Sequence, residues 1–383
     1  MITVAPKPRT TRRSRNLAWA RALLISCPVR GNAQPHFCQG DVVEIRNPYL
    51  MFLGDAPDQL AAKTANGVKV WREDWCVGQF RLPGCNADLK LPDMTIEEAA
   101  EAGVKTVILG VANRGGFMPD TWLVELEKAL DLGMEIASGL HTRISTIPSL
   151  AAKAKEKGLG LYDVRHPTGT FSVANGKKRT GKRLLPVGTD CSVGKMYTTL
   201  ALERALLKRG VNANFRATGQ TGIFIAQSGV PVDAVIADFI SGAAEWISPA
   251  REDAGWDLIE GQGSLFHPSY AGVSMGLLHG SQPDALVLCH EVGRSHMRGL
   301  PGRSLPDLRT CLETNLQAAR LTNLDVKPVG VALNTSNVDR DEAHRVCEQV
   351  EAELGLPCQD PVAMGVDKIT DRLLECFETC EYV

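Results

Sequence analysis

The segment from Arg183 to Gly210 constrains the fold more than any other part of the sequence. Its apolar run RLLPV is typical of a buried strand and leads directly into the loop GTDCSVGK, residues 188–195. The stretch that follows has the apolar periodicity of an amphipathic helix and ends at Gly210. A strand, a loop bounded by glycines, a Gly-Lys pair and a helix, in that order, predict a phosphate-binding loop in an α/β domain.

In such a loop the glycines let successive backbone N–H groups point at one anion. The N-terminus of the helix and the lysine add positive charge at the same place. We therefore predict that this segment binds the phosphate groups of a cofactor. The residues concerned are Gly188, Thr189, Asp190, Cys191, Ser192, Val193, Gly194, Lys195 and Met196.

Two features set this loop apart from the usual pattern. Five residues rather than four separate Gly188 from Gly194, a spacing that resembles dethiobiotin synthetase-like P-loop proteins. Met196 follows Lys195 where nucleotide triphosphatases place a Ser or Thr that holds Mg²⁺, and a thioether is a poor ligand for that ion. Thr198 and Thr199 are the alternatives, each at a different helical angle. We therefore predict no metal, and favour a carrier such as coenzyme A over Mg-ATP.

The order of apolar patterns divides the chain. With 383 residues it is long enough for two domains. Strand-like and helix-like patterns alternate, which predicts α/β domains with parallel sheets. We predict a basic, disordered extension over 1–43, a Rossmann-like domain over 44–168, a linker over 169–183 and a P-loop domain over 184–383. The first domain lacks a G-x-G-x-x-G turn, so no dinucleotide is assigned to it.

The first 40 residues contain seven basic residues and no acidic one. A transit-like leader, an arm that contacts a partner, and an extension of the reading frame upstream of the true start all stay open as explanations. We favour a functionally silent segment.

Composition narrows the function classes. Hydrophobic residues make up 44% and charged residues 22%, as in ordinary globular proteins. The net charge of −2 gives no general attraction to nucleic acid or to an anionic membrane, and no apolar run reaches the roughly 18 residues of a membrane span. The eleven scattered cysteines are typical of free, mostly buried thiols. We expect a cytoplasmic enzyme with a small-molecule substrate, and a homo-oligomer by default.

Three polar side chains stand at or beyond the predicted ends of strands, the edge at which doubly wound sheets bind ligands. Glu260 ends the strand WDLIE and precedes a glycine-rich turn. His267 follows in SLFHPSY, and His290 ends ALVLCH. Glu260 and His267 are candidate proton acceptors and His290 a candidate substrate contact. A purely structural role stays open for each histidine.

Four arginines hold similar positions beyond strands. Arg114 and Arg143 lie in the first domain, and Arg216 and Arg294 in the second. Guanidinium groups suit carboxylates, so these side chains are predicted to bind a diacid, with surface or interdomain salt bridges as the alternative. Asn334, which ends the strand KPVGVALN, is predicted to contact an adenine by analogy with other P-loop proteins of this group.

Six motifs together resemble the family first described as domain of unknown function 1611, which includes the DgcN-type D-glutamate N-acetyltransferases. The motifs are NRGG (113–116), GLHTR (139–143), GTDCSVGKM (188–196), TGQTG (218–222), EGQGSLFHPSY (260–270) and LLHGSQPDALVLCH (277–290). The resemblance covers about residues 45–380. It implies a Rossmann-like domain, a P-loop domain, and acetyl transfer from acetyl-CoA to the amine of D-glutamate or a related D-amino acid.

On that reading the loop anchors acetyl-CoA and the arginines hold the acceptor carboxylates. His267 or Glu260 removes a proton from the ammonium group, because only a neutral amine attacks, and Lys195 or a backbone N–H stabilises the oxyanion. The rival is an ATP- and Mg²⁺-dependent carboxylate-activating ligase of the dethiobiotin synthetase type. A non-catalytic nucleotide sensor is the third possibility.

Overall fold

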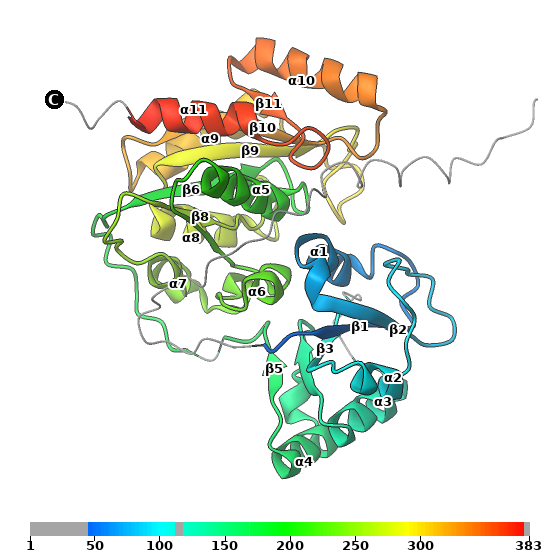
Figure 1. The fold of residues 1–383 in the computed structure, drawn as a ribbon. Helices are drawn as coiled ribbons and strands as arrows, with labels where there is room; N and C mark the ends of the chain where they lie inside the picture. The colour runs from blue at the N-terminus through cyan, green and yellow to red at the C-terminus, as the bar shows by residue number, and fades with distance from the viewer. Residues whose placement is uncertain (1–44, 112–117, 168, 379–383) are drawn as a thin grey trace, which may run out of the picture.

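Continuous apolar runs form the strands of two parallel sheets, each with helices on both sides (Figure 1). The computed structural model describes residues 45–111, 118–167 and 169–378. The extension predicted over 1–43 lies outside these residues. Most residues of the strands are buried, as expected for parallel sheets covered on both faces. The predicted α/β fold class is thus confirmed.

The N-terminal sheet has five strands in the order β2-β1-β3-β4-β5. All neighbouring strands in it are parallel, which requires the crossover helices that the sequence pattern predicted. The strands are β1 (Tyr49–Gly54), β2 (Cys76–Arg81), β3 (Thr106–Leu109), β4 (Glu135–Ser138) and β5 (Leu161–Asp163), and the helices are α1 (Lys63–Trp71), α2 (Ile96–Glu101), α3 (Asp120–Asp131) and α4 (Pro148–Lys157).

The C-terminal sheet has six strands in the order β11-β10-β9-β6-β8-β7, so the strand before the phosphate-binding loop lies inside the sheet. The strands are β6 (Lys182–Gly188), β7 (Ala213–Arg216), β8 (Trp256–Ile259), β9 (Ala285–Glu291), β10 (Lys327–Asn334) and β11 (Cys358–Gln359). The helices are α5 (Lys195–Lys208), α6 (Gln220–Ala226), α7 (Ile240–Ile247), α8 (Ala271–Ser281), α9 (Leu308–Arg320), α10 (Arg340–Leu354) and α11 (Asp367–Glu378).

Local signals set several helix ends. Thr95 begins α2 with a complete capping box, in which Thr95 and Glu98 bond each other's backbone N–H. Pro148 occupies the first turn of α4, and Gly158 ends that helix in the left-handed conformation. Short 3₁₀ turns complete the connections at Glu73–Trp75, Ile144–Thr146, Val232–Ala234 and Ala237–Phe239.

The two sheets are joined by a shared apolar boundary in which α1 packs against α6. A glycine often marks the end of a helix, but α1 continues to Trp71 with Gly67 in its middle. A Cβ atom on Gly67 would lie 2.6 Å from Thr221 Cγ2 in the opposite domain. The glycine therefore permits close approach of the two domains and does not mark a helix end.

The eight cysteines among the described residues are all free thiols, as expected. No helix in the described part of the chain is both long and apolar enough to cross a membrane.

Candidate functional site

The loop from Gly188 to Lys195 connects β6 to α5, as the sequence predicted. Gly194 adopts φ +101°, a conformation that favours glycine, and so turns the chain into the helix. No side chain of the described residues caps α5 at Gly194, so the first N–H groups of the helix are left for an anion. The local geometry is that of a phosphate site.

Lys195 is buried beside this turn, with only 5% of its surface exposed. Its Nζ donates a hydrogen bond of 2.8 Å to the carbonyl oxygen of Asp190, so the ammonium group lies across the loop. Burial lowers the pKa of Lys195. An anion bound at the loop would favour the charged form of this lysine.

The Asp190 carboxylate holds the loop in shape and is fully buried. Its Oδ1 accepts a 2.7 Å hydrogen bond from the N–H of Cys191, and its Oδ2 accepts bonds of 2.7 Å from Arg294 Nη1 and from the backbone N–H of Arg298. Arg294 also donates to the carbonyls of Cys191 and Ser192 and pairs with the Glu291 carboxylate. The Arg294 guanidinium, which the sequence predicted to bind a substrate, thus stabilises the conformation of the loop.

The position after the P-loop lysine is part of the domain boundary. Met196 packs against the apolar cluster of the N-terminal domain, and its Cε lies 3.5 Å from where a Cβ on Gly67 would be. The hydroxyls of Thr198 and Thr199 donate to the carbonyls of Gly194 and Lys195, at 3.0 and 2.7 Å. Both residues are buried, and their hydroxyls point back to the backbone of their own helix.

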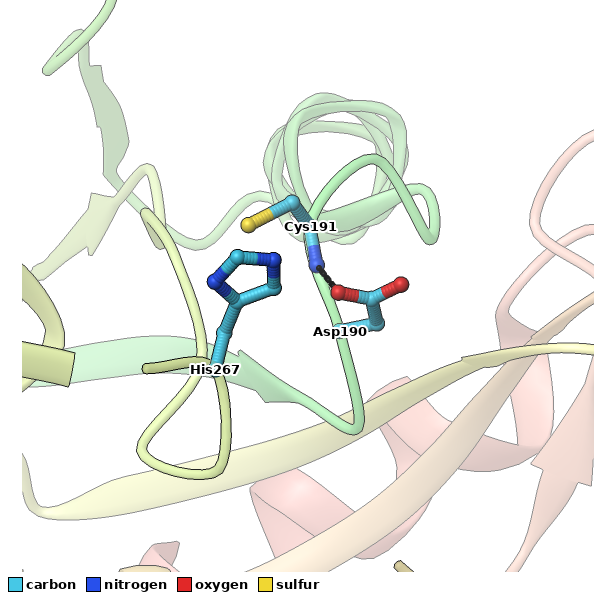
Figure 2. Close-up of side chains that lie close together, drawn as sticks. All are labelled: Asp190, Cys191 and His267. Atoms are coloured by element: carbon cyan, nitrogen blue, oxygen red, sulfur yellow. Dashed lines mark hydrogen bonds between the residues drawn. The ribbon is translucent and has the colours of Figure 1, made fainter. Parts of the chain in front are cut away.

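His267 lies against the loop beside Cys191 and Asp190 (Figure 2). One ligand atom of each of these three residues lies within 4.8 Å of the others. His267 Nδ1 accepts from the N–H of Ser269 at 3.2 Å, so Nε2 carries the proton and donates to the Arg298 carbonyl at 3.1 Å. Both ring nitrogens are therefore engaged.

These contacts do not suit a metal ion. The Asp190 oxygens are occupied by three N–H donors, and the neighbouring charges of Lys195 and Arg294 are positive. Burial raises the pKa of the Cys191 thiol, whereas a metal requires a thiolate. His267 would have to release one of its two backbone partners. We read the cluster as the packing that supports the loop.

Glu260 follows β8 and is 5% exposed. Its Oε2 accepts from the N–H groups of Thr218 and Gly219, at 2.9 and 3.1 Å. Burial nevertheless raises the pKa of Glu260 from 4.5 to about 7, while those two bonds and the charge of Lys195 act in the opposite direction. The carboxyl group of Glu260 therefore keeps its proton to a higher pH than an exposed glutamate does, and it faces the protein interior.

The other predicted arginines fall in three different environments. Arg216 turns back along its strand to the buried Asp257 carboxylate, to which Nη2 lies at 2.9 Å. Arg143, which precedes the 3₁₀ turn Ile144–Thr146, is exposed. Arg114 lies outside the described residues. Arg143 is therefore the one of these three that the described structure leaves open to a ligand.

His290 and Asn334 adjoin the loop at Thr189 and Gly194. His290 Nδ1 is 2.9 Å from Thr189 Oγ1, and burial together with the charge of Arg294 lowers the pKa of this histidine. Asn334 adjoins Gly194, and its Oδ1 accepts from the N–H of Ser336 at 3.1 Å. Both side chains border the loop, where a nucleotide bound by its phosphates would extend.

Two cations were missed by sequence reasoning. Lys63 begins α1 in the N-terminal domain, and burial together with the charges of Arg298 and Arg165 lowers its pKa to about 8. Arg298 follows β9, and its guanidinium contacts Ser192 of the loop. Nothing in the local sequence marks either residue, because one lies in each domain and their common surroundings arise only when the two domains meet.

Both parts of the chain match described families. Residues 80–167 match a Rossmann-like domain and residues 172–370 match a P-loop domain, and the two are described as the N- and C-terminal parts of a domain of unknown function, DUF1611. Together they cover more than half of the chain.

Two curated relatives match along almost their whole length. A protein of Tritonibacter scottomollicae is 53% identical over 86% of this chain and 99% of its own. A protein of a Pseudoalteromonas species is 50% identical over 86% of this chain and all of its own. Each of these relatives is named D-glutamate N-acetyltransferase.

A solved structure shares the fold. The crystal structure of a DUF1611 family protein from Anabaena variabilis superposes with a TM-score of 0.79 at 32% identity. The match covers 86% of this chain and 100% of that one. The arrangement of a Rossmann-like domain on a P-loop domain is therefore common to both.

Proposed function

This chain belongs to the DUF1611 family, and on that premise we propose that it is an N-acetyltransferase that acetylates the amino group of D-glutamate. The observation that carries the proposal is the identity of 53% and 50% to two relatives of that name, over nearly their full length. The rival carboxylate-activating ligase is not favoured by these relatives. The acyl acceptor and the class of reaction follow from the family, and the donor requires a separate argument.

Acetyl-CoA is the donor that fits the loop. Its diphosphate suits the open N–H groups before α5 and the ammonium group of Lys195. Met196 and the backbone-bonded hydroxyls of Thr198 and Thr199 make a magnesium-bound triphosphate a poorer fit. The phosphates would serve as a handle, and no phosphoryl transfer is needed.

The length of coenzyme A places the phosphate-binding site and the site of acetyl transfer far apart. An extended pantetheine arm places the thioester sulfur roughly 16 Å from the nearest phosphorus, by standard bond lengths. Lys195, His267 and Glu260 all adjoin the loop. If the loop holds the diphosphate, these three residues bind the donor and position the loop, and the amine is deprotonated at the far end of the arm. This proposal replaces the proton-acceptor roles expected for His267 and Glu260.

The acceptor, D-glutamate, would bind at the thioester end of the pantetheine arm. D-glutamate carries two carboxylates, which guanidinium groups bind well. Of the predicted arginines that the structure describes, Arg216 and Arg294 are paired with buried aspartates, whereas Arg143 is exposed beyond β4, and we assign it to one of these carboxylates.

The test uses acetyl-CoA and D-glutamate in the presence of EDTA, with release of free thiol followed over time. We expect turnover without metal, and much slower turnover with L-glutamate. Absence of thiol release, together with ATP hydrolysis that appears only on addition of Mg²⁺, would favour the ligase and refute the proposal.

A further inference from the structure

Helix α1 of the N-terminal domain lies over the start of α5. Its Thr64 hydroxyl accepts from Thr221 Oγ1 at 3.4 Å, and Gly67 approaches Met196. Lys63 is the first residue of α1, about one turn before Gly67. The residue that follows the P-loop lysine and the first turn of α1 are thus neighbours across the domain boundary.

Arg298 belongs to the C-terminal domain and contacts the phosphate-binding loop. Its backbone N–H donates to Asp190 Oδ2 at 2.7 Å, its Nη1 donates to the Ser192 hydroxyl, and its carbonyl accepts from His267. The residue is therefore held beside the loop by two contacts of its backbone and one of its guanidinium group. Lys63 begins the helix that packs on Met196, and Arg298 contacts Ser192 of the loop, so both cations belong to the same part of the domain boundary. The positive charge of Arg298 also lowers the pKa of Lys63.

These two cations differ from their neighbours in having no counter-charge. Arg294 pairs with Asp190 and Glu291, and Arg165 pairs with Asp233 at 2.6 Å. Among the described residues, neither Lys63 nor Arg298 has a carboxylate within salt-bridge distance. Lys63 is exposed and Arg298 is half-buried, so an anion can reach both and supply the counter-charge that the described carboxylates do not.

The charge of the loop itself explains why further cations are useful. The loop contains an aspartate, Asp190, whose charge is offset by Arg294. Lys195 is then the one uncompensated cation of the loop segment. Lys63 and Arg298 bring two more positive charges, which suits a ligand with several negative charges, such as the phosphates of coenzyme A.

We propose that Lys63 and Arg298 complete the donor site, binding phosphate groups of coenzyme A from the two sides of the domain boundary. The N-terminal domain thus contributes a residue to the phosphate site of the C-terminal domain. This inference rests on the proposed function in that it takes acetyl-CoA to be the donor. A carboxylate of the acceptor is also an anion that these two cations could bind. The length of the pantetheine arm, however, puts the acceptor far from the loop.

The experiment measures binding by calorimetry, with coenzyme A and glutarate as separate probes. Glutarate carries the two carboxylates of the acceptor without its amine, so no turnover interferes. We expect Lys63→Met and Arg298→Met each to weaken coenzyme A about 10-fold, to flatten the salt dependence of binding, and to leave glutarate unchanged. Lys63→Arg should retain most of the affinity, because it keeps the charge.

The matched control is Lys69→Met on the same helix, whose lysine is already paired with Glu73 at 2.9 Å. It should bind coenzyme A like the wild type. Equal melting temperatures of the variants would show that the effect is local, and in steady-state assays Lys63→Met should raise KM for acetyl-CoA with little change in kcat.

Three outcomes would overturn the inference. They are unchanged coenzyme A affinity in Lys63→Met, loss of glutarate affinity in place of coenzyme A affinity, and failure of the wild type to bind coenzyme A. Coenzyme A binding that depends on Lys63 without any acetylation of D-glutamate would refute the proposed function alone and leave the phosphate site intact.

Discussion

Two buried aspartates of the C-terminal domain are surrounded by arginines, one at each end of the sheet. Asp190 lies in the loop at the carboxyl end, and Asp257 lies near the start of β8. Asp257 Oδ1 accepts from Arg216 and Arg251, and Oδ2 accepts from Ser248 Oγ at 2.7 Å. Both carboxylates are fully buried and fully bonded, yet only one lies beside an open anion site.

The surroundings of Asp257 and Asp190 differ in how their neighbouring cations are bonded. Around Asp257 the arginines end on this carboxylate, on Asp253 or on backbone carbonyls of the same domain. Around Asp190, Lys195, Lys63 and Arg298 are left without a carboxylate among the described residues. A buried Asp–Arg pair therefore does not identify a binding site, and the proposed site rests on the accessible cations Lys63 and Arg298, whereas Arg183 beside Asp257 is buried and bonded within its own domain.

Asp257→Ala gives the largest expected effect. Removal of this carboxylate leaves Arg216 and Arg251 partly buried without their partner, which should lower the free energy of unfolding by about 3–5 kcal/mol. Denaturant titration measures the loss. The affinity of the remaining folded protein for coenzyme A should be unchanged. A weakened affinity would contradict the view that only the end of the sheet at Asp190 binds the donor.

Glu260→Gln should change how stability depends on pH. Because folding raises the pKa of Glu260 from 4.5 to about 7, the folded protein binds more protons than the unfolded chain between these values. The raised pKa of Glu260 stabilises the folded protein by about 3 kcal/mol at most. This contribution is fully present below pH 4.5 and is lost as the pH rises through 7. The difference in unfolding free energy between pH 4.5 and 7.5 should shrink in Glu260→Gln. Glu313→Gln, on an exposed part of α9, serves as the control and should keep the wild-type slope.

Lys195→Ala sharpens the comparison at the loop. Loss of a cation from the phosphate site should raise KM for acetyl-CoA by about 10- to 100-fold, with far less effect on KM for D-glutamate. Initial rates at varied concentrations of each substrate measure the two constants. Equal increases in both would contradict a donor-binding role for the loop.

The pH dependence of donor binding gives the smallest expected effect. Lys63 has a pKa of about 8, and the groups that act on it are Arg298, Arg165 and the Cys191 thiol. It loses its charge as pH rises through 8, so coenzyme A affinity should fall about five- to tenfold between pH 7 and 9. Calorimetry across this range measures it, and Lys63→Arg should remove most of the fall. A wild-type profile that is flat across this range would count against Lys63.

The fold was predictable because buried parallel strands leave a strong local signal. The run ALVLCHE is β9 from end to end, and KPVGVALN is β10. The phosphate-binding loop was predictable for the same reason, since strand, glycines, lysine and helix are consecutive. The domain limits proposed from the sequence, the oligomeric state and the roles of individual site residues stay predictions.

Contacts between the domains were not predictable. Gly67 gave the signal of a helix end, although its purpose is to admit Thr221 from a segment about 150 residues away. Arg216 and Arg294 stand beyond strands as predicted, but a long side chain can turn back, and both reach buried carboxylates. Sequence position fixes where a Cα atom lies, and the partner of a guanidinium depends on the whole fold.

Met196 has a consequence for substitutions at its position. It occupies the position of a magnesium ligand and at the same time packs between the two domains. A substitution that restored a hydroxyl there would also remove apolar contact at the domain boundary. The side chain at this position therefore affects the loop and the domain boundary together, and a Ser or Thr there would require compensating changes in α1.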